Sequence, residues 1–194
     1  RGRFDAAVMT GSICGGFAIA PAKGGGKGGR ALVRARQRLY MVRIAPEAGM
    51  IDDIYSARIL ELAGNIPRIG RLERPDASAR AHSRLCGSTV SVELCMQDGR
   101  VTDFAHEVKA CALGQASSSV MARAIVGASA DELRAVREAM LKMLKEGGPP
   151  PEGRFADLRF LEPVRDYKAR HASTMLTFDA VVDAIGQIEK RRAG

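Results

Sequence analysis

Two cysteines flank a stretch of alternating residues and are the first candidates for chemistry. Cys86 stands just before "STVSVELCMQ", and Cys111 directly follows "VTDFAHEVKA". As thiolates, cysteines bind metal ions or accept sulfur. The chain has four cysteines, without a Cys-x-x-Cys pair and without the paired spacing of a disulfide framework. We therefore expect free thiols in a reducing cytoplasm.

Residues 88–108 must position these two thiols. Apolar and polar side chains alternate from Thr89 to Met96, which is the period of a strand with one buried face. Asp98-Gly99 supplies a tight turn, and the residues after it have the pattern of the return strand. An antiparallel hairpin brings the chain back to the end where it began. Cys86 and Cys111 are therefore predicted to converge at one end of the sheet.

The remaining pattern is mostly helical. A helix is predicted at 51–65, with Asp52 and Asp53 at its start, and a loop at 66–84. A short buried helix should follow Cys111. A longer helix should start at the capping box formed by Ser129 and Glu132 and end at the two glycines that follow it. Residues 155–171 read as a short helix or turn with a loop, and residues 173–190 as the last helix. The order predicts an α+β domain, in which a small antiparallel sheet packs against several helices.

Charge separates the first 49 residues from the rest. The formal net charge is +8, yet residues 1–49 hold nine Lys/Arg and two acids, whereas residues 50–194 hold 21 basic and 20 acidic residues. We expect residues 1–49 to be a disordered Gly/Arg-rich extension, with no role for Cys14, and residues 50–194 to form the domain. The nearly neutral body and the absence of tryptophan argue against nucleic-acid binding. The sequence contains no run of about 18 apolar residues, so no membrane span is predicted.

The stretch "RLCGSTVSVELCMQDGRVTDFAHEVKACALGQASSSVMARAIVGASADEL" resembles the IscU/SufU/NifU N-terminal family of iron–sulfur cluster assembly scaffolds. Members carry Cys-Gly-Asp before a hairpin, a second cysteine followed by small residues that enter a helix, and a third cysteine at the start of the last helix. The likeness extends from Met50 to about Ile185. It implies an IscU/SufE-like fold and no enzymatic turnover. It also implies a cysteine desulfurase partner and delivery to apo iron–sulfur proteins or carriers.

The departures from the family pattern concern its ligands. Cys-Gly-Asp is here Cys86-Gly87-Ser88, so the aspartate is missing. The third cysteine is missing too. One register puts Ser173 in its place, and a shift of two residues puts His171 there. Imidazole binds both iron and zinc. The resemblance thus implies Cys86, Cys111 and His171 as ligands, with Ser173 as the alternative third ligand.

Three functions remain open. The first is a scaffold and sulfur acceptor that binds iron and a transient two-iron two-sulfur cluster and then passes the cluster on. The second is a zinc-bound sulfur-transfer partner of a cysteine desulfurase. Ser88 argues against it, because structural zinc takes four ligands. The third is a degenerate, metal-free protein-interaction module of the same fold. In each of them, Cys95 is expected to be structural and His106 to be a core histidine.

Overall fold

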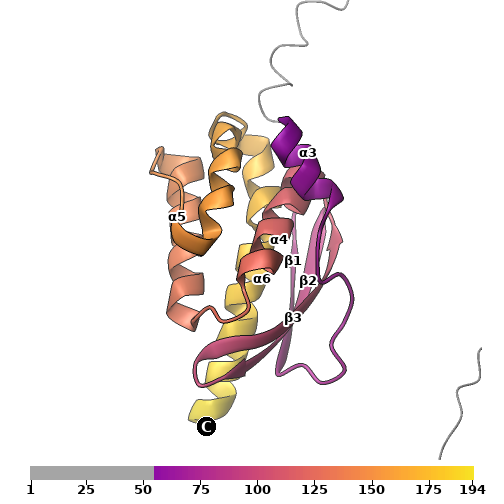
Figure 1. Ribbon diagram of the computed structural model, residues 1–194, viewed down its shortest axis with the longest axis vertical. Coiled ribbons are helices and arrows are strands. Elements are labelled where there is room, and N and C mark those ends of the chain that lie inside the picture. The colour runs from indigo at the N-terminus through magenta and orange to yellow at the C-terminus, as the bar shows by residue number, and fades with distance from the viewer. Residues whose placement is uncertain (1–54) are drawn as a thin grey trace, which may run out of the picture. The chain divides into compact units, whose positions relative to one another are not determined.

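The computed structural model describes residues 55–194 (Figure 1). The predicted extension at 1–49, including Cys14, and the predicted helix start at Asp52 and Asp53 lie outside the described residues. The first described helix, α3 (Ala57–Gly64), begins after Ser56, whose hydroxyl accepts a hydrogen bond from the Ile59 amide. This is the N-cap arrangement that satisfies one free amide of the first turn.

Three antiparallel strands form one sheet in the order β1-β2-β3, namely β1 (Ala77–His82), β2 (Thr89–Gln97) and β3 (Arg100–Lys109). The predicted hairpin is β2–β3, with Thr89 opposite Lys109. Asp98 and Gly99 both have positive φ, 51° and 75°. Positive φ at both central residues is what a type I′ hairpin turn requires. The predicted fold class, α+β with a small antiparallel sheet, is confirmed.

The prediction of a loop through residues 66–84 was wrong in part, because β1 lies within it. Ala77 and Ala79 are buried on the face that β1 shares with its neighbour, and they alternate with exposed Ser78 and Arg80. Alanine buries little surface, so this alternation is a weak signal in the sequence. The loop that precedes β1 also covers the outer edge of β3, because the His106 amide donates to Arg68 O and the Gly70 amide donates to His106 O.

Helices α4 (Ala112–Ala124) and α6 (Lys168–Ala193) pack against the sheet, and α5 (Ala130–Glu146) packs on α6 (Figure 1). The predicted capping box starts α5, since Ser129 Oγ accepts from the Glu132 amide at 3.1 Å. Its apolar stripe is buried, and Gly147 ends the helix in the left-handed conformation. The buried core of the sheet face is formed by Val90, Val92 and Leu94.

A 3₁₀ helix, η1 (Gly153–Asp166), occupies the segment predicted as a short helix or turn. Its buried residues recur every three positions, at Phe155, Leu158, Leu161 and Val164. This is the period of a 3₁₀ helix, in which residues i and i+3 eclipse. The helix α6 then begins at Lys168, five residues before the predicted start.

The long helix α6 runs along the sheet from one end of the hairpin to the other (Figure 1). Near its C-terminal end, Arg192 donates to Met96 O at 2.6 Å, beside the β2–β3 turn. Near its N-terminal end, Ser173 lies beside Cys111 at the opposite end of the hairpin. Within residues 55–194, no helix combines the length and the apolar character that crossing a membrane would require.

Candidate functional site

Cys86 lies in the short connection between β1 and β2. The loop is closed by two backbone hydrogen bonds of 2.9 Å, from the Ser83 amide to Ser88 O and from the Gly87 amide to Ser83 O. Gly87 has a φ of 69°, in the left-handed region that favours glycine. The loop therefore holds Cys86 at a fixed position on the rim of the sheet, with the residue exposed to solvent.

Two buried serines surround the Cys86 thiol. Its Sγ lies 3.3 Å from Ser83 Oγ and 3.0 Å from Ser88 Oγ. Hydroxyls that donate to the thiolate favour the charged form. The Ser83 and Ser88 hydroxyls, helped by the positive charge of Arg170, lower the pKa of Cys86 to about 7. A substantial fraction of this thiol is consequently ionised near neutral pH.

Cys111 follows β3 and is the N-cap residue of α4. It is partly buried, and its Sγ lies 3.5 Å from Ser173 Oγ on α6. Thr89 pairs with Lys109, so Cys86 and Cys111 extend from the same end of the β2–β3 hairpin. Arg170 influences Cys86, and Ser173 contacts Cys111. Both thiols therefore border the first two turns of α6.

Gly114 allows α4 and α6 to approach closely at this point. A β-carbon on Gly114 would lie 2.9 Å from Ser173 O and 2.8 Å from Ala110 Cβ. Contacts this short do not occur between real β-carbons and a backbone, so the helices would have to separate. The absence of a side chain at position 114 thus allows α6 to lie close enough for Ser173 to contact Cys111.

Substituting alanine for Gly114 is expected to destabilise the protein by about 1–3 kcal/mol, because α6 must shift away from α4. Urea unfolding followed by circular dichroism measures this free energy. Gly186→Ala on α6 is the matched control, since nothing lies within 4 Å of its added β-carbon. That variant should be neutral or stabilised by up to about 1 kcal/mol, through the higher helix propensity of alanine. Equal effects of the two substitutions would contradict the close crossing.

The two candidates for the third ligand lie in different surroundings. Ser173 is fully buried, donates to Arg170 O at 2.9 Å and lies beside Cys111. The His171 ring instead faces η1, where its Nε2 lies 3.1 Å from Val164 O and 3.0 Å from Arg165 O. The structure thus brings Cys111 and Ser173 together and does not bring His171 into hydrogen-bond contact with either thiol. The ligand set itself stays a prediction.

The donor set at this site is small. In the part of the chain that the structure describes, no group of three or more His, Cys, Asp or Glu side chains is gathered closely enough to hold a metal ion. Two thiols and nearby hydroxyls are what the described residues offer. Structural zinc sites, by comparison, use four protein ligands.

The sequence patterns did not indicate Ser83 as a neighbour of Cys86. Ser83 acts on Cys86 because β1 ends just before it, and the weak alanine pattern of β1 concealed that geometry. Two other predictions concern residues away from the site. Cys95 lies on β2 with its Sγ 3.3 Å from Arg74 O. His106 is buried against Phe104, and its Nε2 lies 3.0 Å from Pro67 O.

Removing the serine hydroxyls should raise the pKa of Cys86. In a Ser83→Ala, Ser88→Ala double variant the thiolate loses its two donors, so less of it is present at pH 7. Its alkylation by iodoacetamide at pH 7 is expected to slow by about 3- to 10-fold, while the rate above pH 9 converges on that of the unchanged protein. Mass spectrometry of the Cys86 peptide across a pH series measures this. Ser91→Ala on β2 is the control, and a pH profile unaltered in the double variant would refute the role of the hydroxyls.

Comparison with known proteins places this chain in a family. The family model described as the NifU-like N terminal domain matches residues 54–192. A curated iron–sulfur cluster assembly scaffold protein IscU of Thermotoga maritima is 26% identical over 137 residues, which is 71% of this chain and 96% of that protein. Its counterpart from Streptococcus pyogenes serotype M1 is 22% identical over 135 residues, which is 70% of this chain and 84% of that protein. These relatives are named as scaffolds rather than enzymes.

Solved structures agree. The N-terminal part of a nitrogen-fixing NifU-like protein from Brucella abortus is 74% identical, with a TM-score of 0.72 over 73% of this chain and 99% of that chain. A putative SUF-system scaffold from Fervidobacterium islandicum AW-1 is 22% identical, with a TM-score of 0.63 over 69% of this chain and 98% of that chain, and it shows the fold alone. With a family match across nearly all the described residues, the chain belongs to the NifU-like N-terminal domain family, as the resemblance in its sequence predicted.

Proposed function

We propose that this protein is an iron–sulfur cluster assembly scaffold whose Cys86 accepts sulfur from a cysteine desulfurase. The main observation in support is the pair of thiols at one end of the β2–β3 hairpin. One of them, Cys86, is exposed and partly ionised near neutral pH. Membership in the NifU-like N-terminal domain family and the names of the curated relatives support the scaffold role.

The sulfur step needs a nucleophile that an enzyme-bound persulfide can reach. The Cys86 thiolate attacks the outer sulfur of the persulfide on the desulfurase, a bond forms between the two sulfurs, and the original sulfur–sulfur bond breaks. The desulfurase cysteine leaves as a thiolate, so no external oxidant or reductant is needed. Exposure of Cys86 and its lowered pKa both suit this attack. The positive charge of Arg170 further favours the anionic sulfur.

The cluster is cargo that must leave the protein. Cys86 and Cys111 would supply two thiolate ligands, and Ser173 is the neighbouring hydroxyl. The third position is Ser173 or His171. We favour Ser173, because it contacts Cys111, whereas His171 is engaged by two carbonyls of η1. A hydroxyl binds an iron–sulfur cluster more weakly than a thiolate does, which would favour release to an apo-protein or a carrier.

Anaerobic reconstitution of the full chain tests the proposal. The protein is incubated with ferrous iron, cysteine, a cysteine desulfurase and dithiothreitol, which reduces persulfide sulfur to sulfide. Its visible absorbance, iron, acid-labile sulfide and zinc are then measured. A visible chromophore with equal iron and sulfide is expected. One zinc per chain without a chromophore would favour the zinc-bound sulfur-transfer protein instead. A colourless protein without metal or transferred sulfur would refute the scaffold function and would favour the protein-interaction module.

A further inference from the structure

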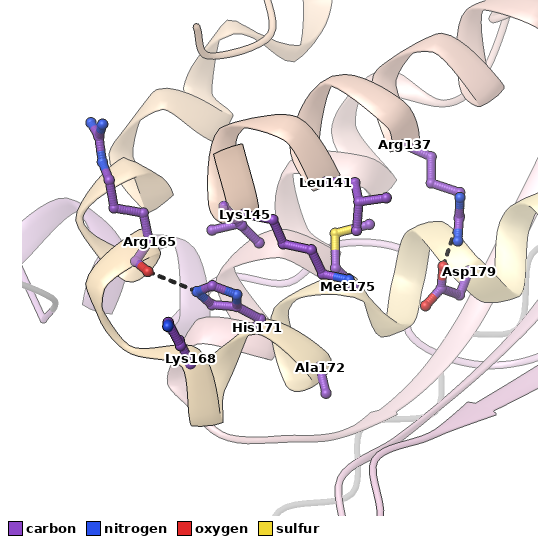
Figure 2. Close-up of a pocket in the computed structure, with 10 residues that line it drawn as sticks. Arg137, Leu141, Lys145, Arg165, Lys168, His171, Ala172, Met175 and Asp179 are labelled. Carbon is purple, nitrogen blue, oxygen red and sulfur yellow. Dashed lines mark hydrogen bonds and ion pairs between the residues drawn. The ribbon is translucent and has the colours of Figure 1, made fainter. Parts of the chain in front are cut away.

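A second site lies on the other side of α6. A cavity of about 570 Å³ opens between α5, η1 and α6 (Figure 2). Four cations line it, with Arg137 and Lys145 from α5, Arg165 from η1 and Lys168 from α6. Asp179 is the one carboxylate in the lining. The volume falls in the range of about 300–1,000 Å³ that small-molecule sites occupy.

Two of these cations are already neutralised by neighbours. Arg137 Nε donates to the Asp179 carboxylate at 2.7 Å, and Arg165 pairs with Glu162. Lys145 and Lys168 are exposed, and neither ammonium group has an ion pair or a side-chain hydrogen bond with another residue in the range 55–194. The cavity therefore presents two uncompensated ammonium groups, which would attract an anion and repel a metal cation.

Apart from His171, the rest of the lining is apolar. Leu144 and Met175 are buried in the wall, and half-buried Leu141 contributes further apolar surface. In Figure 2, Lys145 extends past Met175, so charged and apolar groups face the same space. An occupant that matches both features would carry an anionic head and a hydrocarbon body. Small-molecule sites in proteins commonly combine apolar walls with a few polar groups that orient the ligand.

His171 forms part of the same wall. Its Nε2 faces two carbonyl oxygens, which can only accept hydrogen bonds, so this nitrogen carries the proton. The two contacts fix the ring against η1. His171 thus belongs to this cavity, whereas Ser173, two residues further along α6, belongs to the thiol site. The two sites use different faces of the same helix.

We infer that this cavity binds a small amphipathic organic anion. A carboxylate or phosphate head would lie between Lys145 and Lys168, and an apolar chain would contact Leu141, Leu144 and Met175. The proposal does not depend on cluster assembly, because none of the residues that it uses is hydrogen-bonded to the Cys86 or Cys111 thiol.

Isothermal titration calorimetry of the full chain, once with octanoate and once with octyl phosphate, tests the inference. At least one of the two is expected to bind saturably, and comparison of the pair separates carboxylate from phosphate recognition. Octanol lacks the negative charge, and inorganic phosphate lacks the hydrocarbon chain. Each should therefore bind at least about tenfold more weakly.

Substitutions that remove or keep the charges of Lys145 and Lys168 test whether these two residues bind the anion. A Lys145→Gln, Lys168→Gln double variant should bind the anion at least about tenfold more weakly, and Lys145→Arg, Lys168→Arg should retain binding. Lys142→Gln on α5, outside the cavity, is the control. Circular dichroism checks that each variant is folded. Absence of saturable binding by both anions, octanol binding as tight as octanoate, or undiminished affinity in the glutamine variant would each overturn the inference. Selective binding of an acidic peptide alone would overturn it as well.

Discussion

Replacing Cys86 or Cys111 with alanine is expected to abolish cluster formation in anaerobic reconstitution. Each thiolate would be a direct ligand, and the described residues hold no group of three or more metal-binding side chains that could compensate. Loss of a residue that only hydrogen-bonds to a metal ligand typically lowers metal affinity about 10- to 100-fold, so loss of a direct ligand should lower it further. The visible absorbance and the iron and sulfide content per chain measure the effect.

Cys95→Ala is the matched control for both substitutions. Cys95 lies on β2, and its thiol contacts Arg74 O rather than either candidate ligand. That variant should assemble as much cluster as the unchanged protein. The two site variants should also differ from each other. Sulfur uptake should be lost with Cys86, which is exposed, and should persist without Cys111, which is partly buried. Cluster assembly that survives both single substitutions would exclude this pair of ligands.

Among the substitutions discussed, replacing Ser173 with cysteine is expected to give the largest increase in the amount of cluster that the protein retains. Ser173 Oγ lies 3.5 Å from Cys111 Sγ, so a sulfur at this position would add a third thiolate to the site. Thiolates bind iron–sulfur clusters far better than hydroxyls do. Iron and sulfide content after reconstitution should rise, and transfer of the cluster to an apo-ferredoxin should slow by about tenfold or more. The lost hydrogen bond to Arg170 O should cost only about 0.5–1.5 kcal/mol of stability.

The matched control is Ser118→Cys on α4, which adds a thiol at a buried serine that has no hydrogen-bond partner among the described side chains. It should leave cluster content and transfer rate unchanged. His171→Cys distinguishes the two registers for the third ligand. If it increases cluster retention more than Ser173→Cys does, the third position belongs to residue 171 and the proposed geometry is wrong.

The sequence was sufficient for elements with strong local signals. Asp98-Gly99 and the alternation around Val92 predicted the hairpin, and the Ser129 cap predicted the start of α5. Local chemistry decides these features, because turn conformation and capping depend on a few adjacent residues. The convergence of Cys86 and Cys111 followed from the hairpin and needed no further information.

The rest depends on contacts that local patterns do not encode. The strand β1 was missed because Ala77 and Ala79 give a weak alternation, and with it the position of Ser83 was missed. Ser173 follows Cys111 by 62 residues in the chain, and its place beside Cys111 depends on the close crossing of α4 and α6 at Gly114. The cavity around Lys145 and Lys168 combines three elements, and no short motif marks it.

The most direct test of the account is to locate sulfur on the protein before any iron is added. The full chain is incubated anaerobically with a cysteine desulfurase and cysteine, and each cysteine peptide is examined by mass spectrometry. If Cys86 is the sulfur acceptor, the added mass of one sulfur atom appears on the Cys86 peptide. It is lost in Cys86→Ala and diminished in the Ser83→Ala, Ser88→Ala variant. Sulfur confined to another cysteine, or none on any cysteine, would contradict it.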